Sequence, residues 1–95
     1  MNGALELISL FDLPRGHEGT VSSGDLAAAD DAARELALRL YEIGFVDGER
    51  VRVVARGFPG GEPIAVRVGG TIFALRRFEA ERVLVAPLRN GRAKP

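Results

Sequence analysis

The chain has 95 residues, the size of one domain, and 46% of them are hydrophobic, an ordinary fraction for a globular protein. It has no cysteine, which excludes disulfides and cysteine-based zinc sites, and it has neither an apolar run long enough to cross a bilayer nor a signal sequence, so we expect a cytoplasmic protein. The net charge is zero, but residues 1–47 carry −6 and residues 48–95 carry +6, which predicts a dipolar surface.

The N-terminal part predicts two short strands with a turn between them. Residues 5–10 (LELISL) form the first strand or an extended lead-in. Residues 12–16 (DLPRG) predict a turn, because proline fixes φ and glycine permits positive φ. Residues 18–22 form a weak second strand, and residues 22–25 form a loop that offers helix N-caps.

One helix is predicted from residue 26 to residue 43. Its apolar positions recur at helical spacing, at Ala29, Ala32 or Ala33, Leu36, Leu40 and Ile43. Gly44 follows at the position where a left-handed residue ends a helix. The spacing predicts a helix that packs this stripe against the core.

The C-terminal half predicts three strands in succession. Residues 49–56 alternate, with Val51 and Val53 on one face and Arg50 and Arg52 on the other. A loop at residues 57–63 carries Phe58 at its tip, where aromatic side chains often anchor interfaces. The strands at 64–68 and 71–75 flank Gly69-Gly70, which suits a two-residue hairpin turn.

The last elements are a helical turn at residues 78–81 and a closing strand at 83–85. We expect Phe73 to face the core and Phe78 to anchor the turn. The fold class is therefore mainly β with one inserted helix, a small β-barrel. We assign the barrel domain to residues 1–86 and a flexible basic tail to residues 87–95.

Catalytic chemistry finds little support in the sequence. The serines have no histidine nearby other than His17, and nothing suggests a catalytic triad, so we expect a protein that is not an enzyme. His17, Glu18 and Asp25 are the candidate ligands for a divalent transition metal such as Fe²⁺ or Zn²⁺, although their spacing is not that of a known metal motif.

A stripe of arginines covers the predicted sheet, at Arg50, Arg52, Arg56, Arg67, Arg76, Arg77 and Arg82. Nucleic-acid binding would require interleaved aromatic residues and a basic net charge, and the chain has neither. We favour solvated strand faces balanced by nearby glutamates, and we expect no nucleic-acid partner. A nucleic-acid-binding SH3-like domain stays open as an alternative.

Several motifs in order resemble the FeoA family, the ferrous iron transport protein A. They are LYEIGF at residues 40–45, Asp47-Gly48, the valines at 51–54, GEPI at 61–64, ALRRFEA at 74–80, and the opening turn at 10–16. The resemblance covers nearly the whole chain. It implies an SH3-like β-barrel with an inserted helix, small, cytosolic and non-catalytic.

The resemblance also implies a partner, the FeoB membrane transporter, whose cytosolic part is a GTPase. The expected contact residues are Phe58, Arg76, Arg77 and the exposed helix face with Arg34, Arg39 and Glu42. Arg76 and Arg77 could equally bind carboxylates within the chain, such as Glu79 and Glu81. The membrane would be reached only through this partner. A metal-binding or metal-responsive protein is the alternative, and uncapped strand edges allow a homodimer.

Overall fold

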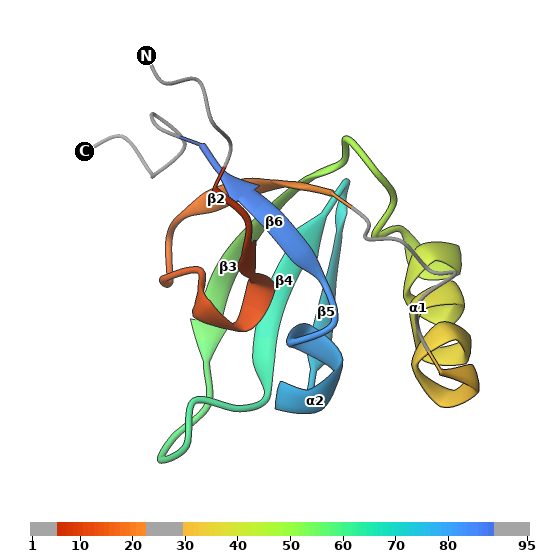
Figure 1. Ribbon diagram of the computed structural model, residues 1–95. Helices are drawn as coiled ribbons and strands as arrows, with labels where there is room; N and C mark the ends of the chain where they lie inside the picture. The colour runs from red at the N-terminus through yellow and green to blue at the C-terminus, as the bar shows by residue number, and fades with distance from the viewer. Residues whose placement is uncertain (1–5, 23–29, 89–95) are drawn as a thin grey trace.

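The computed structural model describes residues 6–22 and 30–88, which form a curved sheet with one main helix beside it (Figure 1). The elements in chain order are β1 (Ile8–Ser9), the 3-10 helix η1 (Leu10–Asp12), β2 (Glu18–Val21), α1 (Asp31–Ile43), β3 (Arg50–Arg56), β4 (Ile64–Val68), β5 (Thr71–Leu75), α2 (Arg77–Ala80) and β6 (Leu84–Pro87). Within this described part, no helix is long and apolar enough to span a membrane. The expected class, mainly β with one inserted helix, is confirmed.

The strands form one antiparallel sheet in the order β1-β6-β2-β3-β4-β5. β3, β4 and β5 are neighbours in both sequence and space, and they form a meander. β6 instead returns to lie between β1 and β2. Both ends of the described chain therefore contribute to the same sheet.

The alternation predicted for the central strands is confirmed. Val51 and Val53 of β3 are buried, whereas Arg50 and Arg52 lie on the opposite face. β4 buries Ile64, Val66 and Val68. The hairpin to β5 closes at the predicted two-residue loop, with a φ of 61° at Gly69, the positive value that a type II′ turn requires at its first position.

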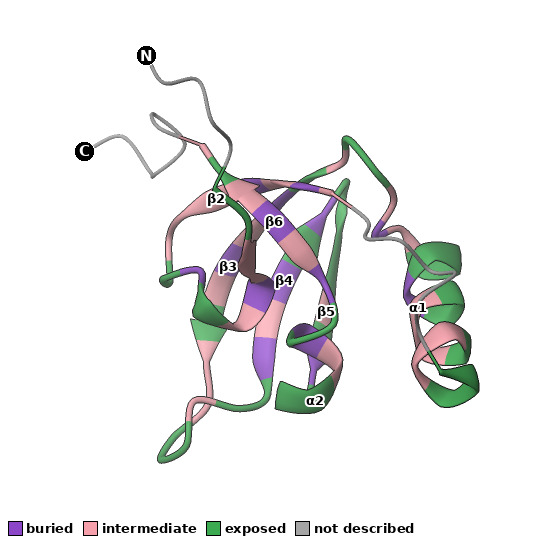
Figure 2. Cartoon of the chain, viewed as in Figure 1, coloured by how far each residue is buried: buried purple, intermediate pink, exposed green. Residues whose placement is uncertain are grey.

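The core lies on the concave side of the sheet, where Figure 2 shows the buried positions of the strands. Its fully buried large side chains are Leu10, Leu13, Ile64, Val51, Val53, Val66 and Val85. Phe73 packs against this cluster as predicted, with its ring centroid 6.0 Å from that of Phe45. The strands thus bury an apolar layer of ordinary small-domain size, and the described part of the core holds no buried charge.

The predicted first strand, residues 5–10, is shorter than expected. Pairing covers only Ile8–Ser9, and the chain then turns into η1. The reason is that both Leu10 and Leu13 are fully buried, a spacing of three that suits a 3-10 turn and not a strand. The backbone N–H of Leu10 donates to the carbonyl of Val83 at 2.7 Å and fixes this turn to the segment that enters β6.

The helix begins later than the predicted residue 26, at Asp31. Asp30 is its N-cap and accepts a hydrogen bond from the backbone N–H of Ala33 at 2.8 Å. The predicted caps at residues 23–25 and the start of the predicted helix lie outside the described residues. The end is as predicted, because Gly44 stops the helix with a φ of 130°.

The predicted packing of the helix is wrong in part. Leu40 is the one residue of α1 that is fully buried, and Leu36 is half-buried against the core. Ile43, expected in the same stripe, is exposed, and of the two alternatives Ala32 and Ala33 only Ala33 is half-buried. Figure 1 shows α1 standing beside the sheet, and Figure 2 shows how little of it is buried. α1 therefore meets the barrel along a narrow line.

Two details at the C-terminal end also differ from the prediction. Phe78 does not anchor the turn, because 59% of it is exposed, and Ala80 is the buried residue of α2. The closing strand, predicted at residues 83–85, is β6 at Leu84–Pro87. Residues 89–95, most of the predicted tail, lie outside the described part, so the tail stays a prediction.

Candidate functional site

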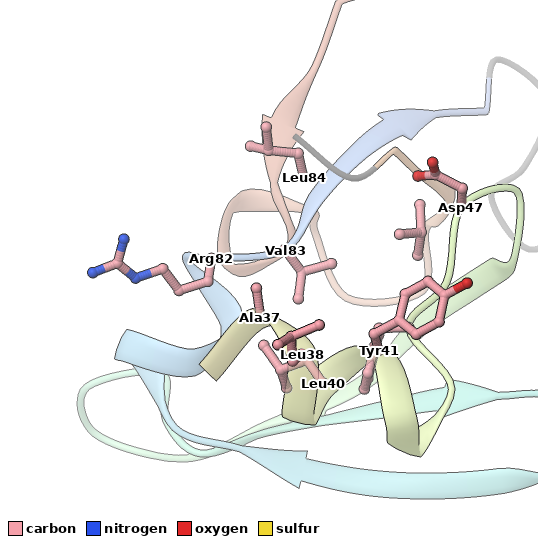
Figure 3. Close-up of a pocket in the computed structure, with 10 residues that line it drawn as sticks. Ala37, Leu38, Leu40, Tyr41, Asp47, Arg82, Val83 and Leu84 are labelled. Atoms are coloured by element: carbon pink, nitrogen blue, oxygen red, sulfur yellow. The ribbon is translucent and has the colours of Figure 1, made fainter. Parts of the chain in front are cut away.

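An apolar groove of about 350 Å³ separates α1 from the edge of the barrel. It arises because α1 meets the core through Leu40 and the half-buried Leu36, so the flank of the helix beside Leu40 does not reach the sheet. Side chains from three segments line this space: Ala37, Leu38 and Tyr41 from α1, Val21 from β2, and Val83 and Leu84 at the entry to β6. Figure 3 shows those of α1 and of the entry to β6. The groove is therefore built by parts of the chain that are distant in sequence.

The walls of the groove are unusually apolar for an exposed surface. Leu38 is 49% exposed and Tyr41 is 53% exposed, although both are large side chains that normally pack. Arg82 marks one end of the groove and Asp47 the other (Figure 3). An apolar floor with one charge of each sign at its ends is suited to binding a protein segment.

A second hollow, of about 310 Å³, lies on the other flank of α1. Phe78 of α2 and Leu36 of α1 supply its apolar surface, and Arg39, Arg82 and Glu35 supply its charges. Arg82 borders both hollows. The two hollows are thus the two sides of the narrow contact that holds α1 to the barrel.

The structure does not gather the predicted partner-binding residues into one patch. Phe58 is 95% exposed at the tip of the β3–β4 loop, as expected. Arg39 borders the second hollow. Arg34 forms an ion pair with Asp31 of its own helix at 2.7 Å, and Glu42 is exposed on α1. The predicted residues are therefore spread over the loop tip, α2 and α1.

Arg76 and Arg77 differ in their surroundings. Arg76 is exposed, and its backbone N–H donates to the Glu79 carboxylate at 2.8 Å at the start of α2. The Arg77 side chain is engaged within the chain: its Nε lies 2.8 Å from Oε2 of Glu81, and its guanidinium lies 4.9 Å from the centre of the Phe11 ring. The hydrogen bond to Glu81 raises the pKa of Arg77 above its usual value.

Two further arginines of the predicted stripe act inside the fold, which the sequence did not indicate. Arg56 donates to the carbonyls of Phe11 and Leu13, the latter at 3.0 Å, and its guanidinium lies 4.8 Å from the Phe11 ring. Arg52 donates to the carbonyl of Gly16 and to Glu18, both at 3.0 Å. Arg56 and Arg52 thus fasten the N-terminal turns to β3.

The candidate metal ligands do not form a recognisable site. Glu18 is bound by Arg52 at 3.0 Å and lies 3.8 Å from Arg50, so a cation there would have to displace two arginines. Asp25 lies outside the described residues. Among residues 6–22 and 30–88, no three histidine or carboxylate side chains come together around one point. Within the described residues, His17 and Glu18 therefore have no third candidate ligand grouped with them.

The groove residues were also missed from sequence, although a signal was present. Leu38 and Tyr41 are three residues apart, so they share one side of a helix. They fall outside the stripe that contains Leu36 and Leu40. A second apolar stripe on a helix that already has one predicts a surface for another partner.

Comparison with known proteins gives consistent results. The sequence model of the FeoA domain matches residues 8–87. The FeoA protein of Stenotrophomonas maltophilia, an SH3 domain protein solved in complex with zinc, is 50% identical, with 82% of this chain and 88% of that chain covered and a TM-score of 0.67. The FeoA protein of Chlorobium tepidum is 33% identical, with coverage of 93% and 81% and a TM-score of 0.65.

A more distant neighbour shares the fold alone. A manganese-dependent transcriptional repressor is 24% identical, with a TM-score of 0.70, and the match covers 90% of this chain but only 44% of the repressor. A search of the curated proteins found no match. The similarities confirm the predicted small SH3-like fold.

Proposed function

The chain belongs to the FeoA domain family, and from this we propose that it is an accessory protein of ferrous iron uptake that docks on the cytosolic region of a FeoB-type, GTPase-linked iron transporter. A role in activating ferrous iron transport has been suggested for the Stenotrophomonas relative. In this proposal the protein acts in the cytoplasm by surface complementarity, without catalysis and without nucleic acid, and it meets the membrane only through the transporter.

The apolar groove beside α1 is the observation that supports docking most directly. Leu38 and Tyr41 expose about half of their surface along a hollow of about 350 Å³. Covering such side chains contributes roughly 25 cal/mol for each Å² of apolar surface removed from water. We assign the main contact to this groove, with Phe58, Arg76 and Arg39 as further contact residues elsewhere on the surface.

The test is titration calorimetry of the purified protein against the cytosolic GTPase region of its transporter, with and without Fe²⁺ and nucleotide. We expect saturable binding that Leu38→Gln weakens. Ile43→Gln is the matched control, because Ile43 is an exposed apolar residue of the same helix that does not border the groove. Arg76→Ala tests the predicted arginine contact. Absence of binding under every condition would exclude docking on the cytosolic region.

A metal-responsive protein is the second candidate, and the zinc bound to the 50% identical relative favours it. His17, Glu18 and Asp25 are the residues to test. Stoichiometric Zn²⁺ or Fe²⁺ binding that disappears in His17→Ala would support this candidate. Binding that persists in His17→Ala would place the metal elsewhere, and no binding would remove the candidate.

A further inference from the structure

The outer face of the sheet carries a row of side chains that the proposed docking at the groove does not use. The register of the strands sets Glu18 of β2 opposite Arg52 of β3, Arg52 opposite Arg67 of β4, and Arg67 opposite Ile72 of β5. Residues directly opposite each other in neighbouring strands point to the same side. Arg50 shares this side, because it lies two residues from Arg52. None of these residues borders the groove beside α1.

The acidic residue in this row is already neutralised. Glu18 is only one-fifth exposed, and its carboxylate lies 3.0 Å from Arg52 and 3.8 Å from Arg50. Arg52 is further fixed by its hydrogen bond to the carbonyl of Gly16 at 3.0 Å. The guanidinium of Arg52 is therefore held rigidly in the middle of the face.

Arg67 is the unusual member of the row. It is exposed, and it makes no ion pair with any residue that the structure describes. Its cross-strand neighbour Arg52 has the same charge, an arrangement that destabilises a sheet. Three arginines against one glutamate leave this face with a net charge of +2. An anionic group placed between Arg52 and Arg67 would remove the repulsion.

We propose that this basic face, made of Arg50, Arg52 and Arg67 with Ile72 at its edge, is a docking surface for an acidic segment of a partner protein. Guanidinium groups match carboxylates in geometry, and a fixed arginine loses little freedom on binding. Ile72 is half-exposed and offers an apolar contact next to the charges. The inference goes beyond the groove and does not depend on the identity of the transporter.

The same face is poorly suited to nucleic acid. Alternation along the strands sets Thr20 beside Glu18, Ala65 beside Arg67 and Ala74 beside Ile72, so no aromatic side chain joins this row to stack on bases. A protein segment that combines carboxylates with apolar residues fits these features better.

The experiment uses a short oligoglutamate as the probe and follows backbone amide and arginine side-chain NMR signals of the whole protein at low salt. We expect shifts at Arg50, Arg52, Arg67 and Ile72, and weakening by added salt. Arg67→Gln should weaken binding about threefold, the size of one exposed charge pair. Arg76→Gln is the matched control, because it removes the same charge from another surface.

The outcomes separate clearly. Shifts confined to the basic face, together with a loss in Arg67→Gln that Arg76→Gln does not share, support the proposal. Equal losses in the two variants would reduce the effect to net charge and overturn it. Shifts centred on other residues, or tighter binding of a DNA duplex than of oligoglutamate under the same conditions, would overturn it as well. Failure of transporter docking at the groove would leave these results unaffected.

Discussion

Removal of the Arg56 guanidinium is the sharpest test of how the N-terminal turn is held. Arg56 reaches from the end of β3 to two carbonyls of the η1 region, those of Phe11 and Leu13, and covers the Phe11 ring at 4.8 Å. The turn itself is short, and η1 spans only Leu10–Asp12. Its position therefore depends on this side chain as well as on the burial of its two leucines.

The magnitude follows from these contacts. A hydrogen bond from a charged donor contributes about 1.5–3 kcal/mol, and a cation–π contact adds about 0.5–1 kcal/mol. Water can satisfy part of the freed carbonyls, so we expect Arg56→Met to lower the free energy of unfolding by about 2–4 kcal/mol. For a domain of this size that loss corresponds to a fall in melting temperature of about 10–25 °C. Methionine keeps most of the apolar stem in place.

The assay is urea unfolding followed by far-UV circular dichroism, together with a thermal scan. Arg67→Met is the control, because it removes the same charge from an exposed position and should change the free energy of unfolding by less than about 0.5 kcal/mol. Arg56→Lys should fall between the two, since lysine keeps the charge and the donors but lacks the planar guanidinium that lies over the Phe11 ring. Equal midpoints for Arg56→Met and Arg67→Met would refute the reasoning.

Two other substitutions test local features of the fold. Gly57→Ala should lower the free energy of unfolding by about 1–3 kcal/mol, because the new Cβ would clash with the carbonyl oxygen of Glu62. Gly60→Ala in the same loop is the control, because its Cβ would meet nothing within 4 Å. Similar urea midpoints for the two variants would contradict this prediction. Asp30→Ala should lower the free energy of unfolding by about 1 kcal/mol and reduce the helical circular dichroism signal, because the N–H of Ala33 loses its cap. Asp30→Ser should keep most of the stability and most of the signal, because serine can also cap a helix. An unchanged signal in the alanine variant would argue against the cap.

The parts of the fold that local sequence dictates were predictable. Val51 and Val53 alternate with arginines, so the inward face of β3 could be read directly, and Gly69-Gly70 marked the hairpin that follows β4. These features depend on residues that are neighbours in the chain. The end of α1 at Gly44 belongs to the same group.

The parts that depend on distant residues were not predictable. Arg52 donates a hydrogen bond to Glu18, 34 positions away in the sequence, and Arg56 donates one to the carbonyl of Phe11, 45 positions away. Nothing in the alternation of β3 distinguishes these two arginines from the solvated Arg50. The stripe on α1 likewise shows which side chains share a face, but not how much of that face the barrel covers.

The same holds for the candidate site. Phe58 was correctly placed at an exposed loop tip, because breakers on both sides of it define a loop. The groove was missed because its two walls, α1 and the start of β6, are about forty residues apart and meet only in the folded chain. Leu38 and Tyr41 gave the one local clue to it.

The single buried residue of α1 has a consequence for how the molecule opens. An element that packs through so few side chains opens with a smaller free energy than the sheet behind it, so its amides should exchange with solvent by local opening while those of β3 and β4 exchange only by global unfolding. A partner that fills the groove would slow exchange along α1 far more than in the barrel. Ordering α1 on binding costs conformational entropy, so a partner at the groove binds more weakly than its contacts alone would give.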